Sequence, residues 1–230
     1  MSRRRAAFPG GGARLLRRAD QRLDGASSIL DDPSTIPEDI SPLTERIARR
    51  VRDLRTTHGL SLDALAAHCG VSRSMISLIE RGESSPTAVL LEKLAAGLGV
   101  PLAALFDAPP AGAEPVSRRA DQLSWRDPAS GYVRRNVSPG GFASPTQIVE
   151  VSFPAGARVA YETGAREPRV HQQVWVLEGR IEVTLGADAH LLDAGDCLAL
   201  VLDRPVAYRN PTRRRARYAV VITTEPVPRR

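Results

Sequence analysis

The pattern of apolar residues changes near the middle of the chain. From residue 41 to 106, apolar residues recur every three or four positions, which is the spacing of amphipathic α-helices with one buried face. From residue 121 onward, short runs such as TQIVEVSF, RIEVTL and RYAVVIT follow a period of two, which is typical of β-strands. The sequence therefore predicts an all-α domain at 41–106 and an all-β domain at 121–225.

Five short helices are expected in the first domain, because capping residues and glycines interrupt the helical pattern. The expected starts are Ser41-Pro42, Ser61, Ser72 and Ser85-Pro86. The expected ends are Gly59, Gly70, Gly82 and Gly99. The run VPLAALF after Gly99 predicts a short fifth helix. The inward-facing side chains are expected to be Leu43, Ile47, Val51, Leu54, Leu62, Leu65, Ala66, Met75, Ile76, Ile79, Leu90, Leu91, Leu94 and Leu98.

Two segments lack a core-forming pattern. Residues 1–40 are basic and Gly-rich, then acidic and interrupted by proline, so we expect a disordered tail. Seven arginines precede residue 23, and they either touch phosphates nonspecifically or are simply solvated. Residues 107–120, DAPPAGAEPVSRRA, are rich in Pro, Ala and charge, and are expected to link the two domains.

Composition narrows the class of protein. The formal net charge is +6, and Lys93 is the only lysine. Guanidinium groups suit phosphates and base edges, although such arginine usage equally fits a nucleotide-composition habit of the genome. Cys69 and Cys197 lie far apart, and we interpret both as reduced, small apolar residues of a cytoplasmic protein. No apolar run approaches the ~20 residues of a membrane span, and the N-terminus lacks the apolar stretch of a secretory signal.

The second and third expected helices are joined by HCGV, and two short helices around a Gly-containing turn form a helix-turn-helix. Over about 46–106 the chain resembles the lambda-repressor-like (XRE) family of DNA-binding domains. The matching residues are Leu62, Leu65, Ala66, Gly70, Val71, Ser72, Ile76, Ile79, Glu80, Gly82, Pro86, Leu94, Leu98, Gly99 and Leu105-Phe106. The resemblance implies double-stranded DNA as partner, with the third helix in the major groove.

Carried over from the family, the base-reading positions are Arg73, Ser74, Ser77 and Leu78. The forked guanidinium of Arg73 suits the two acceptors of a guanine, and a phosphate can sit near the amides of Ser72 and Arg73 at the helix N-terminus. Leu78 departs from the family's usual long polar residue, so it contacts either a thymine methyl group or a neighbouring subunit.

The loop after the third helix, GESSPT, supplies phosphate contacts in the family. It carries Glu83 where a basic or polar residue would serve better, so we expect Ser84, Ser85, Thr87 and backbone amides to act there. Arg81 is either a cationic partner for DNA or the counter-charge at the end of its helix. The first helix is lined by Arg49, Arg50, Arg52 and Arg55, which we interpret as a solvated face.

The second domain resembles a cupin, a small β jelly roll, over about 145–223. The shared pattern is VLEG at Val176–Gly179, AGD at Ala194–Asp196, and Pro205 followed by Asn210-Pro211. Many cupins bind a metal through histidines and a glutamate, but two of those positions fall here on Gln172 and Val206, and residues 165–168 read AREP. Only His171 remains near the site, with Glu162 and Glu167 as carboxylates. We therefore expect no metal, no cofactor and no catalytic residues.

The former metal positions still predict a pocket. Gln172, Val174, Val176, Val206 and Tyr208 should point into the barrel, with His171, Gln173 and Trp175 on the other face. The expected ligand-binding residues are Tyr161, Arg166, Gln172, Val206 and Tyr208, with Arg169 near the rim, for an anionic or aromatic small molecule. The alternative interpretation makes Tyr161, Trp175 and Tyr208 core or interface aromatics. The run RRRAR at 213–217 is expected to form a solvated turn.

These expectations describe a multidomain transcription regulator rather than an enzyme. Its N-terminal all-α domain would bind DNA, and its C-terminal cupin jelly roll would form a homodimer and take a small-molecule effector. Repression is favoured over activation, and a symmetric dimer would match half-sites ~34–36 Å apart. Two alternatives stay open: a metal-dependent cupin enzyme fused to a DNA-binding domain, and an antitoxin- or nucleoid-like protein whose cupin is purely structural.

Overall fold

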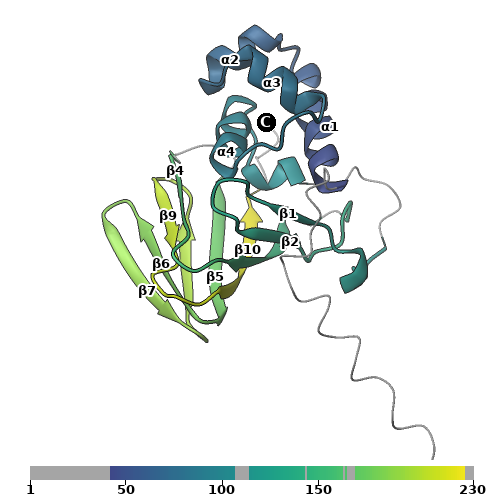
Figure 1. The fold of residues 1–230 in the computed structure, drawn as a ribbon. Helices are drawn as coiled ribbons and strands as arrows, with labels where there is room; N and C mark the ends of the chain where they lie inside the picture. The colour runs from purple at the N-terminus through teal and green to yellow at the C-terminus, as the bar shows by residue number, and fades with distance from the viewer. Residues whose placement is uncertain (1–41, 107–113, 143, 163, 165–168, 226–230) are drawn as a thin grey trace, which may run out of the picture. The chain divides into compact units, whose positions relative to one another are not determined.

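The computed structural model describes residues 42–106, 114–142, 144–162, 164 and 169–225, all within one compact unit. Its first part holds four α-helices: α1 (Pro42–Thr57), α2 (Leu62–Cys69), α3 (Arg73–Glu80) and α4 (Ala88–Gly97), as Figure 1 shows. The fifth predicted helix is wrong as an α-helix, because Leu102–Phe106 forms the 3₁₀ helix η2. The bond from Ala104 N–H to the Pro101 carbonyl spans three residues, and so short a run cannot build an i→i+4 ladder.

The helix boundaries follow the predicted caps with one correction. The Ser61 hydroxyl accepts from Ala64 N–H at 3.0 Å, and the Ser72 hydroxyl accepts from Met75 N–H at 3.3 Å. The fourth helix does not start at Ser85-Pro86, because Thr87 is extended and its hydroxyl accepts from Leu90 N–H at 3.2 Å. Ser41, the other predicted cap, lies outside the described residues.

The predicted apolar faces of the helices do form a core. The fully enclosed members, each at most 2% exposed, are Leu43, Ile47, Val51, Leu65, Ile76, Ile79, Leu91, Leu94 and Leu98. The remaining predicted inward residues pack at the margin of the same core, namely Leu54, Leu62, Ala66, Met75 and Leu90.

The second part consists of antiparallel strands, as its period of two predicts. A 3₁₀ turn, η3 (Arg119–Asp121), precedes them, and the strands are β1 (Ser124–Arg126), β2 (Val133–Asn136), β3 (Thr146–Phe153), β4 (Arg158–Tyr161), β5 (Val170–Glu178), β6 (Arg180–Leu185), β7 (Asp188–Asp193), β8 (Cys197–Val201), β9 (Val206–Arg209) and β10 (Ala216–Thr224). They make one sheet of order β1-β2-β3-β10-β5-β8 and another of order β4-β9-β6-β7 (Figure 1).

The inner faces of the two sheets pack together. The ring of Tyr208 on β9 stacks on that of Tyr218 on β10, with ring centroids 6.0 Å apart. Along β5, Val174 and Val176 are buried whereas Gln173 and Trp175 are exposed, so the predicted alternation is confirmed. A core position for Trp175 is wrong, since its side chain is 50% exposed.

Polar contacts and ring contacts connect the helical part to the strand-rich part. The backbone N–H of Ala88, the first residue of α4, donates to Asp127 at 2.9 Å, and this carboxylate is buried. Asn136 on β2 donates to the Phe106 carbonyl at 3.2 Å, and the Phe106 ring meets Trp125 edge-on at 5.7 Å. The start of α4 and the 3₁₀ helix η2 are therefore both attached to the first two strands.

Candidate nucleic-acid interface

The helix α3 has a buried face and an exposed N-terminal end. Ile76 and Ile79 are buried in the helical core, while Arg73 and Ser74 are exposed. The predicted base-reading residues Ser77 and Leu78 are only half-buried, further along the helix. The part of α3 that is most open to a partner is thus its first turn.

A short connection of three residues, Gly70 to Ser72, joins α2 to the first helical turn of α3. Gly70 adopts a left-handed conformation with φ 64°, and its N–H donates to the Ala66 carbonyl at 2.9 Å, which closes α2. Ser72 then returns to extended backbone and caps α3. Three residues therefore reverse the chain between the helices, and the left-handed turn requires glycine.

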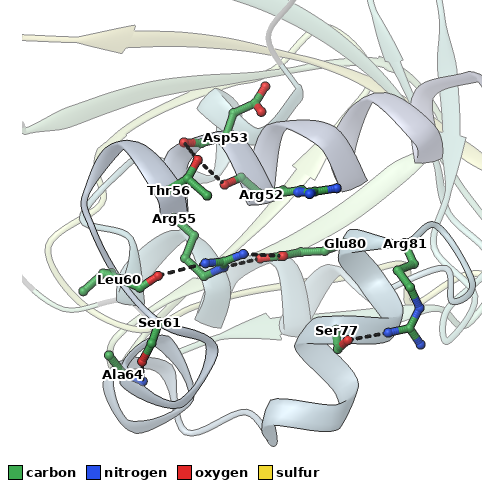
Figure 2. A network of polar contacts seen from close by, with 10 residues as sticks. All are labelled: Arg52, Asp53, Arg55, Thr56, Leu60, Ser61, Ala64, Ser77, Glu80 and Arg81. Carbon is green, nitrogen blue, oxygen red and sulfur yellow. Dashed lines mark hydrogen bonds and ion pairs between the residues drawn. The ribbon is translucent and has the colours of Figure 1, made fainter.

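A buried ion pair holds α3 against α1. Arg55 on α1 contacts both carboxylate oxygens of Glu80 at the end of α3, at 2.6 and 2.8 Å, and donates to the Leu60 carbonyl at 2.8 Å (Figure 2). The side chains are only 14% and 7% exposed. The hydrogen bond to Glu80 raises the pKa of Arg55 above its ordinary value.

This ion pair overturns part of the predicted solvated face of α1. Arg55 is committed to Glu80, and Arg50 donates to the Ala104 carbonyl at 3.1 Å. Arg49 and Arg52 are exposed, as predicted. The reason for the error is that the partners of Arg55 and Arg50 lie 25 and 54 residues further along the chain.

Arg73 makes a looser contact at the opposite end of α3. Its Nε lies 3.4 Å from a carboxylate oxygen of Asp63 on α2, and the two side chains are 65% and 77% exposed. An exposed pair of this kind contributes only ~0–1 kcal/mol, so little free energy is needed to separate it. Arg73 can therefore turn toward a partner at low cost.

Arg81 is engaged within its own loop. Its guanidinium contacts both carboxylate oxygens of Glu83 at 2.7 Å and also donates to the Ser77 hydroxyl, a contact drawn in Figure 2. The hydrogen bond between Arg81 and Glu83 raises the pKa of Arg81 and lowers the pKa of Glu83. Glu83, the residue that departs from the family's loop, is thus the partner of Arg81 in the free protein.

The remaining predicted phosphate-contacting residues differ in their availability. Ser85 is exposed and Ser84 is half-buried. The hydroxyl of Thr87 already accepts a hydrogen bond as the cap of α4. The side chain of Thr87 therefore serves as the N-cap of α4, the helix that follows the loop.

A second candidate site is a cavity of about 90 Å³ in the strand-rich part. Four of the five predicted ligand-binding residues line it, namely Tyr161, Gln172, Val206 and Tyr208. The fifth, Arg166, lies outside the described residues, and so does Glu167. The Tyr208 hydroxyl donates a hydrogen bond to the side-chain oxygen of Gln172 at 2.9 Å.

Sequence reasoning missed several residues of this cavity. Tyr132 and Tyr218 also line it, and the hydroxyls of Tyr132 and Tyr161 lie 3.3 Å apart. Tyr218 could have been found, because it alternates with the buried Val220 and Ile222 along β10. Tyr132 precedes the segment that resembles a cupin, so no pattern pointed to it.

The tyrosine hydroxyls of the cavity are neutral. Burial raises the pKa of Tyr132 to about 12. Burial is also the main reason why the pKa values of Tyr161, Tyr208 and Tyr218 lie above their ordinary value. At neutral pH the four phenols therefore act as hydrogen-bond donors and acceptors without charge.

Two of the former metal positions are described by the structure, and they carry Gln172 and Val206, neither of which is a usual metal ligand. Within the described part of the chain, no group of three or more His, Cys, Asp or Glu residues is placed to hold an ion. His171 lies on the outer face of its sheet, where its Nε2 is 2.7 Å from a Glu225 carboxylate oxygen. Cys69 is half-buried and Cys197 is exposed, and both are free cysteines.

The curated relatives of this chain that are described here are named HTH-type transcriptional regulators. The helix-turn-helix family HTH_3 matches residues 51–105. The HTH-type transcriptional regulator SutR of Escherichia coli (strain K12) is 30% identical over 169 residues, covering 73% of this chain and 89% of SutR. The HTH-type transcriptional regulator PuuR of the same organism is 28% identical over 166 residues, covering 70% and 86%.

One solved structure of a regulator is similar over most of this chain. The crystal structure of an HTH_3 family transcriptional regulator from Vibrio cholerae superimposes with a TM-score of 0.62 at 26% identity, covering 80% of this chain and 98% of that one. Among the described residues, no helix is both long and apolar enough to span a membrane.

Proposed function

Because this chain belongs to the HTH-type transcriptional regulators, we propose that it is a sequence-specific repressor in which α3 reads the major groove. The observation that carries the proposal is the exposed first turn of α3, with Arg73 beside Ser74, on a helix that the Arg55–Glu80 pair holds in place. A major groove admits one α-helix, and a rigidly held helix keeps the register of its side chains on the bases.

Arg73 is the proposed base-reading residue. Its guanidinium matches the two acceptors of guanine, and its pairing with Asp63 is loose enough to be exchanged for a base. Arg81 is assigned a different role, because Glu83 and Ser77 already occupy its guanidinium. Ser74, Ser77 and Leu78 would then adjoin the bases next to that guanine.

The test begins with selection of preferred duplexes from a random library by the full chain. Arg73→Ala should then weaken binding to the selected duplex by ~1–3 kcal/mol, with relaxed selectivity at one base pair. Arg52→Ala, which removes an exposed arginine from α1, is the matched control and should leave that selectivity unchanged. Equal losses on selected and random duplexes would instead make Arg73 a phosphate contact, and no preference for any duplex would refute the proposal.

The strand-rich part is proposed to be a cupin that pairs two chains. The supporting feature is an outer apolar band on the six-stranded sheet, in which Cys197, Trp175 and Ala219 are register neighbours and Val221 pairs with Ile148. Glu150, opposite Ala219, and Gln173, opposite Val221, are the polar residues beside it. Trp175 and Ile148 are 50% and 39% exposed. A second copy of the chain suits this band, because a two-fold dimer presents two α3 helices to two half-sites.

Trp175→Arg should break the proposed dimer, since a charge at the centre of an apolar interface must be desolvated. Analytical ultracentrifugation of the variant should show a monomer where the parent chain shows a dimer. Phe142→Arg also replaces a half-exposed aromatic side chain but lies outside the band, so it should remain dimeric. A dimer that survives Trp175→Arg would place the interface elsewhere.

The cavity is proposed to hold a small-molecule effector rather than a catalytic metal. Gln172 and Val206 line it at the positions where metal-binding cupins carry ligands, and neither side chain binds a divalent ion well. This composition favours a regulator over a metal-dependent enzyme.

A further inference from the structure

The cavity is not built by the strand-rich part alone. Its wall includes Glu92 from α4 and Pro101, Leu102 and Ala103 from the segment around η2. Glu92 is only 5% exposed. A molecule bound in this cavity would therefore touch the helical part and the strand-rich part at once.

Hydrogen-bond donors of the cavity outnumber the partners that the described residues provide. The Gln172 oxygen accepts from Tyr208, which leaves the two amide N–H donors of Gln172 directed to no other described group. Tyr132 and Tyr161 share one hydrogen bond, so one of their two hydroxyl protons stays available. The Tyr218 hydroxyl likewise has no hydrogen-bond partner within the described part. Such a site suits a ligand that presents an acceptor oxygen.

The described ionisable groups that line the cavity balance one another. Glu92 and Arg134 carry one charge of each sign, and the phenols are neutral. A charged ligand that enters this mostly apolar site would lose hydration without gaining an uncompensated counter-charge from these residues, which is unfavourable. An uncharged ligand avoids this loss.

The size of the cavity sets the size of the ligand. Apolar side chains such as Phe153, Val206 and Val220 form much of the wall. A dry cavity of ~150 Å³ is known to take benzene, so a cavity of about 90 Å³ surrounds about four non-hydrogen atoms of a ligand. Resting on the proposed function, we propose that this cavity binds a small uncharged carbonyl compound and that Glu92 transmits its binding to the DNA-binding helices.

The route from Glu92 to the DNA-binding helices is short. Asp127 holds the first residue of α4, and Glu92 lies further along the same helix. Near the end of α4, Gly97 lies so close to α2 that an added Cβ would be 2.6 Å from the Cβ of Cys69. Since interiors this tightly packed are hard to compress, a shift of α4 also moves α2, which the short turn joins to α3.

Glu92 is suited to sense the ligand because it brings a carboxylate into an enclosed site. At low local polarity, electrostatic interactions are stronger than in water, so a dipole placed beside Glu92 changes its preferred position. A ligand that favours one position of α4 thereby changes the affinity for DNA by the same factor that DNA changes the affinity for the ligand.

The class of ligand is tested with three probes of similar size on the full chain: isobutyramide, isobutyrate and isobutylammonium. Isobutyramide should raise the melting temperature by about 2–5 °C at saturation, and the two ions at equal concentration should not. Equal or larger stabilisation by either ion, or none by isobutyramide, would overturn the assignment of an uncharged carbonyl ligand.

The site is tested with two neighbouring glutamines that lie on opposite faces of β5. Gln172→Ala should weaken isobutyramide binding about five- to tenfold, because it removes the amide donors. Gln173→Ala, on the exposed face, should bind the probe as the parent chain does. A similar loss in both variants would place the site outside this cavity.

Transmission is tested on α4. Saturating isobutyramide should change operator affinity of the parent chain by about fivefold or more. Glu92→Gln should still bind the probe but lose this change, whereas Lys93→Gln, on the exposed side of α4, should keep it. A response retained in Glu92→Gln would overturn the role of Glu92. Absence of specific DNA binding by the probe-free parent chain would refute the proposed function, which is a separate result from failure of the probe to bind.

Discussion

The two ends of α3 use ion pairs in different ways. At its C-terminal end, Glu80 makes two short contacts with Arg55, and both side chains are mostly buried. At its N-terminal end, Arg73 lies 3.4 Å from Asp63, and both side chains are mostly exposed. Separating the Arg55–Glu80 pair would leave a mostly buried charge without its partner, whereas the Arg73–Asp63 pair can open for a ligand at little cost. The recognition helix is therefore held at one end and free to exchange partners at the other.

The largest expected effect tests the Arg55–Glu80 pair at the C-terminal end of α3. Glu80→Ala should lower the free energy of unfolding by about 3 kcal/mol, because the Arg55 guanidinium remains mostly buried without its carboxylate. Urea denaturation measures this change. Asp63→Ala, which breaks the pair with Arg73 at the N-terminal end, is the control and should cost less than ~1 kcal/mol. Equal costs for the two variants would remove the distinction between the two ends of α3.

A double variant sharpens the same point. Replacing Arg55 and Glu80 together by leucine should recover much of the stability lost in Glu80→Ala, since no buried charge then remains. Affinity for the selected duplex should nevertheless fall, because the ion pair also sets the orientation of α3. Full affinity in the double variant would show that packing of Ile76 and Ile79 alone orients the helix.

A smaller effect, on DNA affinity, is expected from the Arg73–Asp63 pair. Asp63→Asn removes the partner of Arg73 and one negative charge near the DNA, so affinity for the selected duplex should rise about two- to fivefold. Fluorescence anisotropy at fixed salt measures it. Glu45→Gln, at an exposed position on α1, removes the same charge without touching Arg73 and separates the two causes. Weaker binding by Asp63→Asn would mean that Asp63 holds Arg73 in its reading position.

The smallest effect concerns Arg81 and Glu83 in the loop after α3. The hydrogen bond from Arg81 lowers the pKa of Glu83 below its ordinary value of 4.5. A depressed carboxyl pKa stabilises the folded state above the unfolded pKa, and this contribution is lost as pH falls through the folded pKa. Glu83→Gln should therefore melt slightly below the parent chain at neutral pH and together with it in acid. A gap that persists in acid would assign the stabilisation to something other than the carboxylate.

Local patterns were sufficient for most of the helical part. Ser61, Ser72 and Gly70 act on backbone groups within four residues, so their roles follow from adjacent sequence. The errors arose where the local sequence allows two conformations, either two possible helix caps or two types of helix. Thr87 rather than Ser85 caps the fourth helix, and the fifth element closes as a 3₁₀ turn because too few residues follow Pro101.

The strand-rich part was predictable in its alternation and not in its partners. The cupin resemblance directed Gln172 and Val206 inward, the period of two added Val174, Val176 and Tyr208, and all but Val174 and Val176 line the cavity, while those two are buried. The period of two carried no information on which side chains of other strands meet them, so Tyr132 was missed. It also could not show whether the face that carries Trp175 is covered, and that face is exposed in the single chain.

The sequence by itself determined the helix-turn-helix and the inner face of β5, because caps, turns and periodicity act over a few residues, and its resemblance to known families indicated the class of protein. Only the tertiary structure decided that Arg55 is bound to Glu80, 25 positions away, and that Glu92 joins the tyrosines of the strand-rich part in one cavity. Those contacts depend on which elements pack together, and packing sums many weak interactions between residues distant in the chain.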